Sequence, residues 1–288
     1  MKRFLLLLAF VGCVSMYSCS CDSDGLNEES SQTVNITNLS VMSFNIKNSN
    51  ETGTNAWDNR KAACLAMINE VKPNLIGMQE VTPAQKSFFD SNLSDYKSLG
   101  VARDGSTSSE YSVIYYRTDI FSVESSSTFW LSATPDFMSK GWDGACYRIC
   151  TWAKLKIKCS GKELYYFNTH VDHLGTVAQK QSIILLKERI SKIAGDNAMV
   201  FLTGDFNMQP TNANMVSMTE YMNDTRVQFP NGEFYSSGTY NGWGSSSTII
   251  DYIWYRNATP VSYKVLRDAY SGVTYISDHY PIIGVFSL

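Results

Sequence analysis

Short apolar runs of strand length recur along this chain from Leu39 onward and alternate with a few helical stretches. The helical stretches have recognisable boundaries: the first ends at Lys72-Pro73, the second follows the capping residue Thr82, and the third ends at Gly195. Interleaved strands and helices of this kind predict an α/β or α+β fold in which helices cover β-sheets. We expect strands at Leu39–Ile46, Leu75–Val81, Tyr111–Tyr116, Thr151–Lys158, Leu164–His170, Met199–Thr203, Ile249–Tyr255 and Pro281–Phe286, and helices at Arg60–Val71, Pro83–Leu93 and Thr176–Ile193.

The first residues of the chain resemble an export signal. Lys2 and Arg3 precede the apolar run Phe4–Val14, which is too short to span a bilayer. A cysteine behind small residues at this position resembles a bacterial lipobox. In that motif the cysteine thiol is lipidated, and the cysteine becomes the new first residue. Cys13 and Cys19 both fit, and Cys19 is favoured because cleavage there leaves an apolar region of normal length. Simple cleavage and secretion is the alternative interpretation.

A polar segment and one folded domain follow the export signal. The residues after Cys19 are rich in Ser, Asp, Glu and Asn without apolar periodicity, which indicates a flexible tether. No long linker or short repeat divides the sequence after Leu39. We predict a lipoprotein signal peptide at residues 1–18, a tether at residues 19–37 and one domain at residues 38–288. This organisation predicts an exported monomer, anchored by a lipid on Cys19 at the outer membrane, in the periplasm or at the cell surface.

Composition excludes some classes of protein and disfavours others. With 44% hydrophobic and 18% charged residues, the chain can form a folded core and is neither a fibre nor a disordered tail. Loss of Lys2 and Arg3 with the leader would lower the net charge from −3 to −5, which argues against a broad cationic surface for nucleic acid but leaves a local basic groove open. Four further cysteines lack the CxxC spacing of zinc sites, so we expect mostly buried thiols, with one disulfide as an alternative: Cys64, Cys146, Cys150 and Cys159.

Several of the expected strands end in a carboxylate, an amide or an imidazole. One such residue alone is most simply a strand-end cap or a turn former. Buried strand-end charges are costly unless other groups compensate them, and the histidines His170, His173 and His279 all lie among these residues, each with an Asp within two positions. We therefore expect the polar residues to converge. Glu, Asp and Asn oxygens suit Mg²⁺ or Mn²⁺, whereas zinc would require more His or Cys.

Six short motifs mark these strand ends, in the order Ser43-Phe44-Asn45, Gln79-Glu80, Asn168-Thr169-His170, Gly204-Asp205-Phe206-Asn207, Ile250-Asp251-Tyr252-Ile253 and Ser277-Asp278-His279-Tyr280-Pro281. In type and order they resemble the endonuclease/exonuclease/phosphatase superfamily, from about Leu39 to the end of the chain. That superfamily includes deoxyribonuclease-I-like nucleases, deadenylases, sphingomyelinases and inositol-phosphate 5-phosphatases. The resemblance implies a four-layered α/β sandwich of two packed, mostly antiparallel β-sheets flanked by helices, with the active site at one rim.

The resemblance also implies a site for a divalent cation, Mg²⁺ or Mn²⁺. Asn45 and Glu80 would hold the metal, and Asp278 would be a further ligand or an acid close to the ligands. Asp205 and Asn207 would bind and orient the attacking water and the phosphate.

Further catalytic and substrate-binding roles follow from the same resemblance. His279, held by Asp251, would act as the base or polarise the phosphate. His170 would donate a hydrogen bond or a proton to the phosphoryl group. Glu110, just before an earlier strand, is expected to pair with His170, although an ordinary solvated charge is the alternative.

Local similarity adds two substrate-binding residues and a set of aromatic residues. Arg148 matches a phosphate-contacting arginine, and His173 would widen the polar rim. The alternatives are a solvated charge for Arg148 and an ordinary loop for His173. Four aromatic residues in loop-like surroundings could stack on a base or sugar, or could cover the core: Trp130, Trp142, Tyr240 and Trp243.

The resulting hypothesis is a metal-dependent phosphoesterase that hydrolyses a phosphodiester or phosphomonoester by in-line attack of water. The substrate stays open between nucleic acid, a phospholipid such as sphingomyelin, and an inositol or sugar phosphate. A non-catalytic surface lipoprotein that binds glycans or nucleic acid through its loop aromatics is the alternative from another class.

Overall fold

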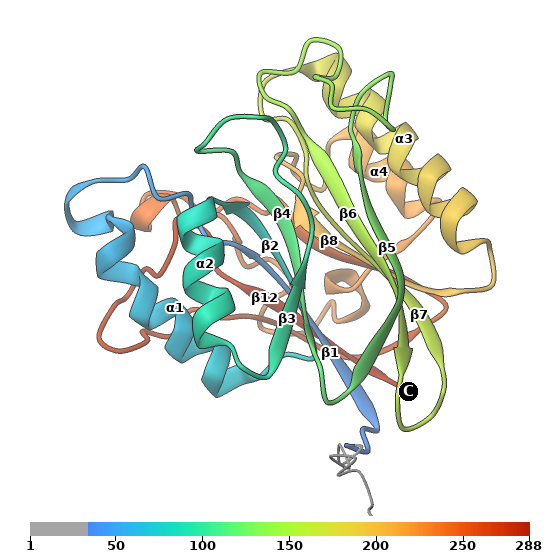
Figure 1. Ribbon diagram of the computed structural model, residues 1–288, viewed down its shortest axis with the longest axis horizontal. Helices are drawn as coiled ribbons and strands as arrows, with labels where there is room; N and C mark the ends of the chain where they lie inside the picture. Colours follow the sequence, from blue (N-terminus) through green and yellow to red (C-terminus); the bar gives the residue numbers. More distant parts are fainter. Residues whose placement is uncertain (1–33) are drawn as a thin grey trace, which may run out of the picture. The chain divides into compact units, whose positions relative to one another are not determined.

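Two β-sheets of six strands each pack face to face, with helices on both outer faces (Figure 1). The structure is a computed structural model and describes residues 34–288. The first sheet contains, in spatial order, β11 (Thr259–Val265), β12 (Ile282–Ser287), β1 (Asn38–Asn45), β2 (Leu75–Val81), β4 (Tyr111–Arg117) and β3 (Tyr96–Leu99). The second contains β5 (Phe121–Trp130), β6 (Ile149–Ile157), β7 (Glu163–His170), β8 (Met199–Asp205), β10 (Asp251–Arg256) and β9 (Asn223–Asp224). This confirms the predicted sandwich of two mostly antiparallel sheets.

Each sheet contains one parallel pair of strands, and these pairs place the polar strand ends. In the first sheet β1 runs parallel to β2, with Asn45 beside Gln79. In the second sheet β7 runs parallel to β8, with His170 beside Asp205. The antiparallel strand β10 places Asp251 on the other side of Asp205. The ends of parallel strands meet at one edge of a sheet, so these residues gather there.

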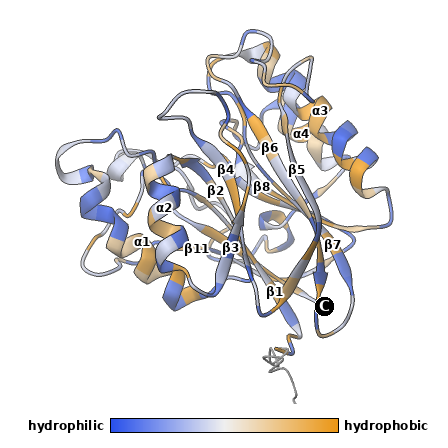
Figure 2. Cartoon of the chain, in the orientation of Figure 1, coloured by the Kyte–Doolittle hydropathy of each residue, from blue (hydrophilic) through white to orange (hydrophobic). Residues whose placement is uncertain are grey.

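Three apolar clusters hold the four layers together. Val41, Leu75 and Phe201 belong to the cluster between the two sheets and are fully buried. A second cluster joins the helices α1 and α2 to the first sheet, and a third joins α3 and α4 to the second sheet. Figure 2 shows hydrophobic residues concentrated on the strands and on parts of the helices. Each buried large aliphatic side chain contributes about 1.5–3 kcal/mol. The helices are α1 (Trp57–Val71), α2 (Pro83–Asn92), α3 (Thr176–Ala194) and α4 (Ala213–Thr219).

All eight expected strands are present, and the four that the sequence did not reveal are the edge strands of the two sheets: β3, β5, β9 and β11. β5 illustrates the reason, because its middle residues, Glu124–Ser127, are exposed and polar. Edge strands with polar surfaces resist pairing with other chains, and for the same reason they lack the apolar pattern that identifies central strands.

The expected helices are present with small shifts at their ends. α1 begins at Trp57 rather than Arg60, directly after a 3-10 turn at Gly53–Asn55. α2 begins at Pro83. Thr82, just before it, forms a capping box with Gln85, the third residue of the helix. α4 was not expected from the sequence, and it spans only seven residues.

The predicted signal peptide and most of the predicted tether lie outside the described residues. Where the described part begins, Ile36 packs against the core between the sheets, and the Thr37 carbonyl accepts a hydrogen bond from the backbone of Leu288. In residues 34–288 no helix is both long enough and apolar enough to cross a bilayer. The four cysteines of this part of the chain are free thiols, so the alternative of a disulfide between them is not realised.

A buried layer of amides joins the two sheets next to the polar rim. The Gln79 amide donates to Asn168 Oδ1 at 2.7 Å, and Asn168 in turn donates to the carbonyls of Met78 and Val113 at 2.8 and 2.9 Å. These bonds cross from β7 of the second sheet to β2 and β4 of the first. They satisfy polar groups that would be costly to bury unpaired, and they fix how the sheets face each other.

Gly77 of β2 provides the space for this layer. A Cβ atom there would lie 2.1 Å from Thr203 Oγ1 and 2.5 Å from Asn168 Oδ1. We therefore expect Gly77→Ala to lower the free energy of unfolding by at least about 1–3 kcal/mol, because the sheets must move apart. Urea denaturation measures the change. Gly105→Ala is the matched control, since its Cβ would meet no atom within 4 Å; equal stabilities of the two variants would contradict the prediction.

Candidate active site

A cleft of about 440 Å³ opens at the rim where the polar strand ends meet. Nine of the eleven site residues expected from the sequence line it. The other two, Asn45 and Asp251, are buried directly behind the lining, and each makes hydrogen bonds to residues that line it. The nine lining residues are Glu80, Glu110, Arg148, His170, His173, Asp205, Asn207, Asp278 and His279.

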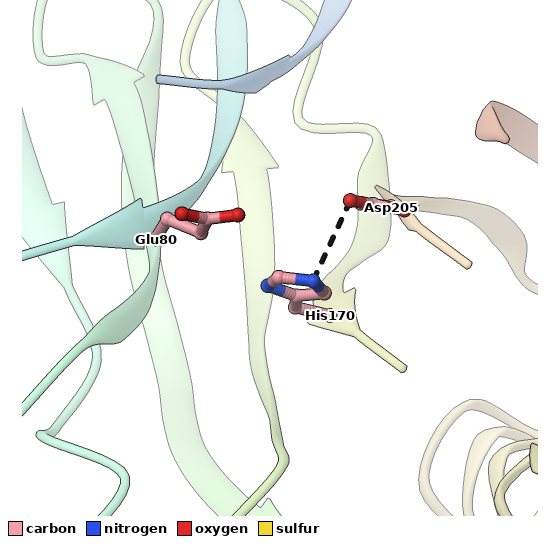
Figure 3. Close-up of side chains that lie close together, drawn as sticks. All are labelled: Glu80, His170 and Asp205. Atoms are coloured by element: carbon pink, nitrogen blue, oxygen red, sulfur yellow. Dashed lines mark ion pairs between the residues drawn. The ribbon is translucent and has the colours of Figure 1, made fainter. Parts of the chain in front are cut away.

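The amide of Asn45 links the two sheets inside the site. Its nitrogen donates to Glu80 Oε1 and to Asp205 Oδ2, both at 3.0 Å, and the side chain has no exposed surface. Glu80 follows Gln79 on β2, and Asp205 ends β8. The bridge therefore brings a carboxylate from each sheet to the same point. Figure 3 shows Glu80 and Asp205 pointing toward each other above His170.

Glu80 is held by neutral donors. Its second oxygen accepts from the backbone and the side chain of Asn48, at 3.2 and 3.1 Å. Burial would raise the pKa of Glu80, but Lys47 and the Asn45 hydrogen bond outweigh it and the pKa is lowered. Among the carboxylates that line the cleft in the described structure, Glu80 alone has no cationic side-chain nitrogen within 4.0 Å.

Glu110 does not pair with His170 as expected. Its side chain accepts from Asn48 at 3.1 Å and forms an ion pair with Arg103. Arg103 lies in the loop after β3 and was not predicted as a site residue. Burial and the nearby Glu80 raise the pKa of Glu110. Arg103 balances this charge, which explains why Glu110 turns toward it rather than toward the imidazole.

His170 lies between the two sides of the cleft as a neutral imidazole. Its Nε2 is 3.1 Å from Asn207 Nδ2 and 3.4 Å from Asp205 Oδ2. Burial, followed by the positive charge of Arg148, holds the pKa of His170 well below its usual value. Asn207, which has a left-handed backbone with φ of 52°, also donates to the Val171 carbonyl at 3.0 Å.

His279 is fixed by Asp251 and protonated. Its Nδ1 lies 2.9 Å from Asp251 Oδ2, which leaves Nε2 facing Asp205 at 3.7 Å. Burial would lower the pKa of His279, but the carboxylates of Asp251 and Asp205 raise it to about 10. Tyr240 packs edge-on against the imidazole, with 5.0 Å between ring centroids. The ring is therefore held in one orientation as a hydrogen-bond donor.

Asp205 is the carboxylate on which these contacts converge. Its Oδ1 accepts from the backbone of Asn207 at 2.9 Å, while Oδ2 faces Asn45 and both imidazoles. Burial raises the pKa of Asp205 to about 7, although His279 opposes the shift. A carboxylate with such a pKa can exchange a proton near neutral pH.

Arg148, His173 and Asp172 form one wall of the cleft. Arg148 lies 3.1 Å from His173 Nδ1 through its Nη2 and 3.7 Å from Asp172 Oδ2 through its Nε. Asp172 itself is only 1% exposed and accepts from the backbone of Gly175 and Cys146 at 2.8 and 3.1 Å. Arg148 is also nearly buried, so its position is fixed. This wall offers a guanidinium and an imidazole ring to an anionic ligand.

Asp278 is paired with Lys47. The Lys47 Nζ lies 3.2 Å from Asp278 Oδ2, and burial of the ammonium is outweighed by Glu80 and Asp278, which raise its pKa. Lys47 follows Asn45 by two residues and has a left-handed backbone with φ of 54°. Its carbonyl is held by Arg60, whose guanidinium also donates to the carbonyls of Ile46 and Ile276.

Comparison with known proteins decides the family. The family model described as Endonuclease/Exonuclease/phosphatase family matches residues 42–279. The chain belongs to this family. The crystal structure of an endonuclease/exonuclease/phosphatase from Bacteroides vulgatus is 30% identical, with a TM-score of 0.79, and the match covers 88% of this chain and 100% of that chain.

Two further relatives are similar over most of their length. The mannosyl-6-phosphatase from Bacteroides thetaiotaomicron is 31% identical, with a TM-score of 0.79, and the match covers 87% of this chain and 100% of that chain. An uncharacterized protein of Acanthamoeba polyphaga mimivirus is 26% identical over 251 residues, which are 80% of this chain and 92% of the relative. Members of the endonuclease/exonuclease/phosphatase family are phosphoester hydrolases and generally use a divalent metal.

The residues of this family member fit a hard divalent cation. Ligand atoms of Glu80, His170 and Asp205 all lie within 4.8 Å of one another. Asn45 adds an amide side chain between the two carboxylates. Such an oxygen-rich set suits Mg²⁺ or Mn²⁺. Glu80, ionised and held only by amides, is the group that most lacks a positive partner.

Sequence reasoning missed several lining residues of this endonuclease/exonuclease/phosphatase site. Lys47 and Asn48 follow Asn45 closely, so proximity to the motif was a usable signal. Arg103 stands in no motif, and only the fold brings it to the cleft. Of the four aromatic residues, Tyr240 alone lines the cleft. The others have structural contacts or partial exposure: Trp130 donates to the Arg103 carbonyl, Trp243 covers Arg60, and Trp142 is 36% exposed.

Asp172 makes the stability of the cleft wall depend on pH. Burial would raise its pKa, but backbone donors at Gly175, Leu174 and Cys146 lower it to about 2. Because the folded pKa lies below the unfolded value, the stabilisation is present above about pH 4 and is lost as the pH falls toward 2. We expect Asp172→Asn to lower the free energy of unfolding at pH 7 by about 1–3 kcal/mol.

Urea denaturation of both proteins across this pH range is the measurement. The difference between wild type and Asp172→Asn should shrink between pH 4 and pH 2. Asp268→Asn is the control, since Asp268 is exposed and does not line the cleft. A difference that stays constant down to pH 2 would contradict the assignment.

Proposed function

We propose that this protein is a divalent-metal-dependent phosphoester hydrolase that acts on a phosphorylated sugar. The observation that carries the proposal is that Glu80, Asp205 and His279 line one open cleft, with His279 held from behind by Asp251. The 31% identity to a mannosyl-6-phosphatase supports a sugar phosphate as the substrate class. The mechanism itself does not depend on that choice.

Glu80 and Asn45 are the residues that would hold the metal, with Asp205 next to them. When bound, a Mg²⁺ or Mn²⁺ ion would neutralise charge on the phosphoryl oxygens and favour departure of the leaving oxygen. Asp278 is not a direct metal ligand in this scheme, because its carboxylate is already paired with Lys47.

Asp205 accepts the proton of the attacking water. Its Oδ1 is tied to the backbone of Asn207, while Oδ2 faces the interior of the cleft beside both imidazoles. A pKa of about 7 suits a general base that works near neutral pH. The Asn207 side chain lies next to His170 and helps to orient the water and the phosphate.

His279 polarises the phosphate rather than acting as the base. Its pKa of about 10 keeps the ring protonated at neutral pH, so it already carries the proton that a base would have to accept. Because Nδ1 is engaged by Asp251, the Nε2 hydrogen is directed into the cleft. Arg148 and His173, which line the same cleft, bind the remaining phosphoryl oxygens by charge-assisted hydrogen bonds.

Activity measurements test the mechanism. With Mg²⁺ we expect hydrolysis of p-nitrophenyl phosphate and of mannose 6-phosphate, and loss of both activities in chelator. Asp205→Asn and His279→Gln should each lower kcat by about 10²–10⁴-fold, because each removes a proton-transfer or charge-stabilising contact. Asp268→Asn is the control and should keep wild-type activity. Full activity in chelator or in either site variant would reject the proposal.

A substrate panel separates the remaining alternatives. Bis-p-nitrophenyl phosphate, DNA, sphingomyelin and an inositol phosphate should be cleaved more slowly than mannose 6-phosphate. Faster cleavage of one of the diesters would make the protein a phosphodiesterase with the same site. Metal-independent binding of a glycan without turnover of any ester would instead support a binding lipoprotein.

We also propose that the protein is exported and anchored through a lipid on Cys19. The support is the sequence pattern alone: a basic start, a short apolar run and a cysteine directly behind the small residue Ser18. Fractionation of a bacterium that expresses the full-length chain tests it. Cys19→Ser should leave the membrane fraction, whereas Cys13→Ser should remain there; membrane association of both variants would contradict the anchor.

A further inference from the structure

Lys47 is the one lysine that lines the cleft in the described part of the chain, and its position is fixed. Its backbone nitrogen donates to Asn45 Oδ1 at 3.0 Å, and its carbonyl accepts from Gln85 at 2.8 Å and from Arg60 at 3.2 Å. The side chain is 24% exposed and reaches Asp278 and Glu51. Lys47 is therefore built into the cleft rather than placed loosely on its rim.

The ammonium of Lys47 removes Asp278 from the set of available metal ligands. Nζ lies 3.2 Å from Asp278 Oδ2, while Asp278 Oδ1 accepts a 3.3 Å hydrogen bond from Ser277. Asp278 is absent from both groups of described side chains whose ligand atoms cluster closely enough to share a metal ion. A second divalent cation next to Asp278 would have to displace the ammonium or lie against it.

The second of those groups does not offer another open metal position. It consists of Asp205, Asp251 and His279. Asp251 Oδ2 and His279 Nδ1 bond to each other at 2.9 Å, and Asp251 does not line the cleft. Only the group of Glu80, His170 and Asp205 has all its members on the cleft lining.

Phosphoryl transfer nevertheless benefits from more than one positive charge around the phosphate. Two-metal hydrolases supply this with paired cations. A lysine ammonium is a compact point charge that can serve the same purpose. We infer that Lys47 takes the place of a second divalent cation, so that the cleft binds one metal ion beside Glu80 and the ammonium supplies the further charge that faces the substrate phosphate. This inference rests on the proposed function and specifies its metal content.

Counting bound Mn²⁺ tests the inference without any measurement of turnover. Titration of the metal-free protein, followed by the electron paramagnetic resonance signal of free Mn²⁺, should give one ion per wild-type chain. Lys47→Met keeps the unbranched side chain as far as Cε but removes the ammonium and frees Asp278, so it should bind a second, weaker ion. Lys47→Arg should still bind one, and the double variant Lys47→Met with Asp278→Asn should return to one. Two ions in the wild type would overturn the inference.

Thermal unfolding followed by circular dichroism shows whether Lys47→Met folds. If it does not, the variant Asp278→Asn tests the number of bound ions instead. We expect Asp278→Asn to retain stoichiometric binding of one Mn²⁺. Loss of that ion would make Asp278 a metal ligand and overturn the inference. A folded Lys47→Met that binds one ion would overturn it as well.

Inorganic phosphate tests the second half of the inference. Calorimetric titration of the Mn²⁺-loaded proteins compares Asp278→Asn with the double variant, which differ only at Lys47. Affinity for phosphate should fall about 10–100-fold when Lys47 is absent, as expected for loss of a charged hydrogen bond. Equal affinities would overturn the role of Lys47. If the wild type binds no Mn²⁺ and hydrolyses no ester, the proposed function fails; two bound ions with normal turnover would reject this inference alone.

Discussion

The hydrogen bonds of the Asn45 amide are the interaction on which the site depends. They join Glu80 of the first sheet to Asp205 of the second, each at 3.0 Å, in a position with no solvent exposure. Without this amide, two carboxylates from separate sheets would face each other in a medium that screens charge poorly. Gln79 of β2 and Asn168 of β7 make a second bond between the two sheets. The contacts that align the sheets therefore also set the geometry of the catalytic groups.

The chain turns sharply where the strands reach the cleft, and three residues other than glycine take left-handed conformations there. Lys47, Glu80 and Asn207 have φ values of 54°, 60° and 52°. Such conformations cost about 1–3 kcal/mol each and persist only where surrounding contacts fix them. Here the contacts come from the site itself, since the backbone of Lys47 donates to Asn45 and that of Asn207 donates to Asp205. The hydrogen bonds of the site residues therefore stabilise these left-handed backbone conformations.

The sequence predicted what depends on local pattern and missed what depends on the assembled fold. Central strands carry apolar runs and end in motif residues, so their positions and the gathering of groups such as Asp205 and His279 could be inferred from composition, order and family resemblance. Edge strands such as β5 have no such pattern because one side of them meets solvent. Arg103 belongs to no motif, and its ion pair with Glu110 forms only because β3 ends beside β4. The expected Glu110–His170 pair was wrong for the same reason.

Charge compensation explains why a cation would bind at one point of the cleft and not at others. Asp251 is paired with His279, Asp278 with Lys47 and Glu110 with Arg103. Asp205 faces two imidazoles, only one of which is protonated. In the described structure Glu80 is left with amide donors alone, although its lowered pKa keeps it ionised. An incoming divalent ion therefore gains most beside Glu80, where it replaces neutral donors instead of competing with an existing ion pair.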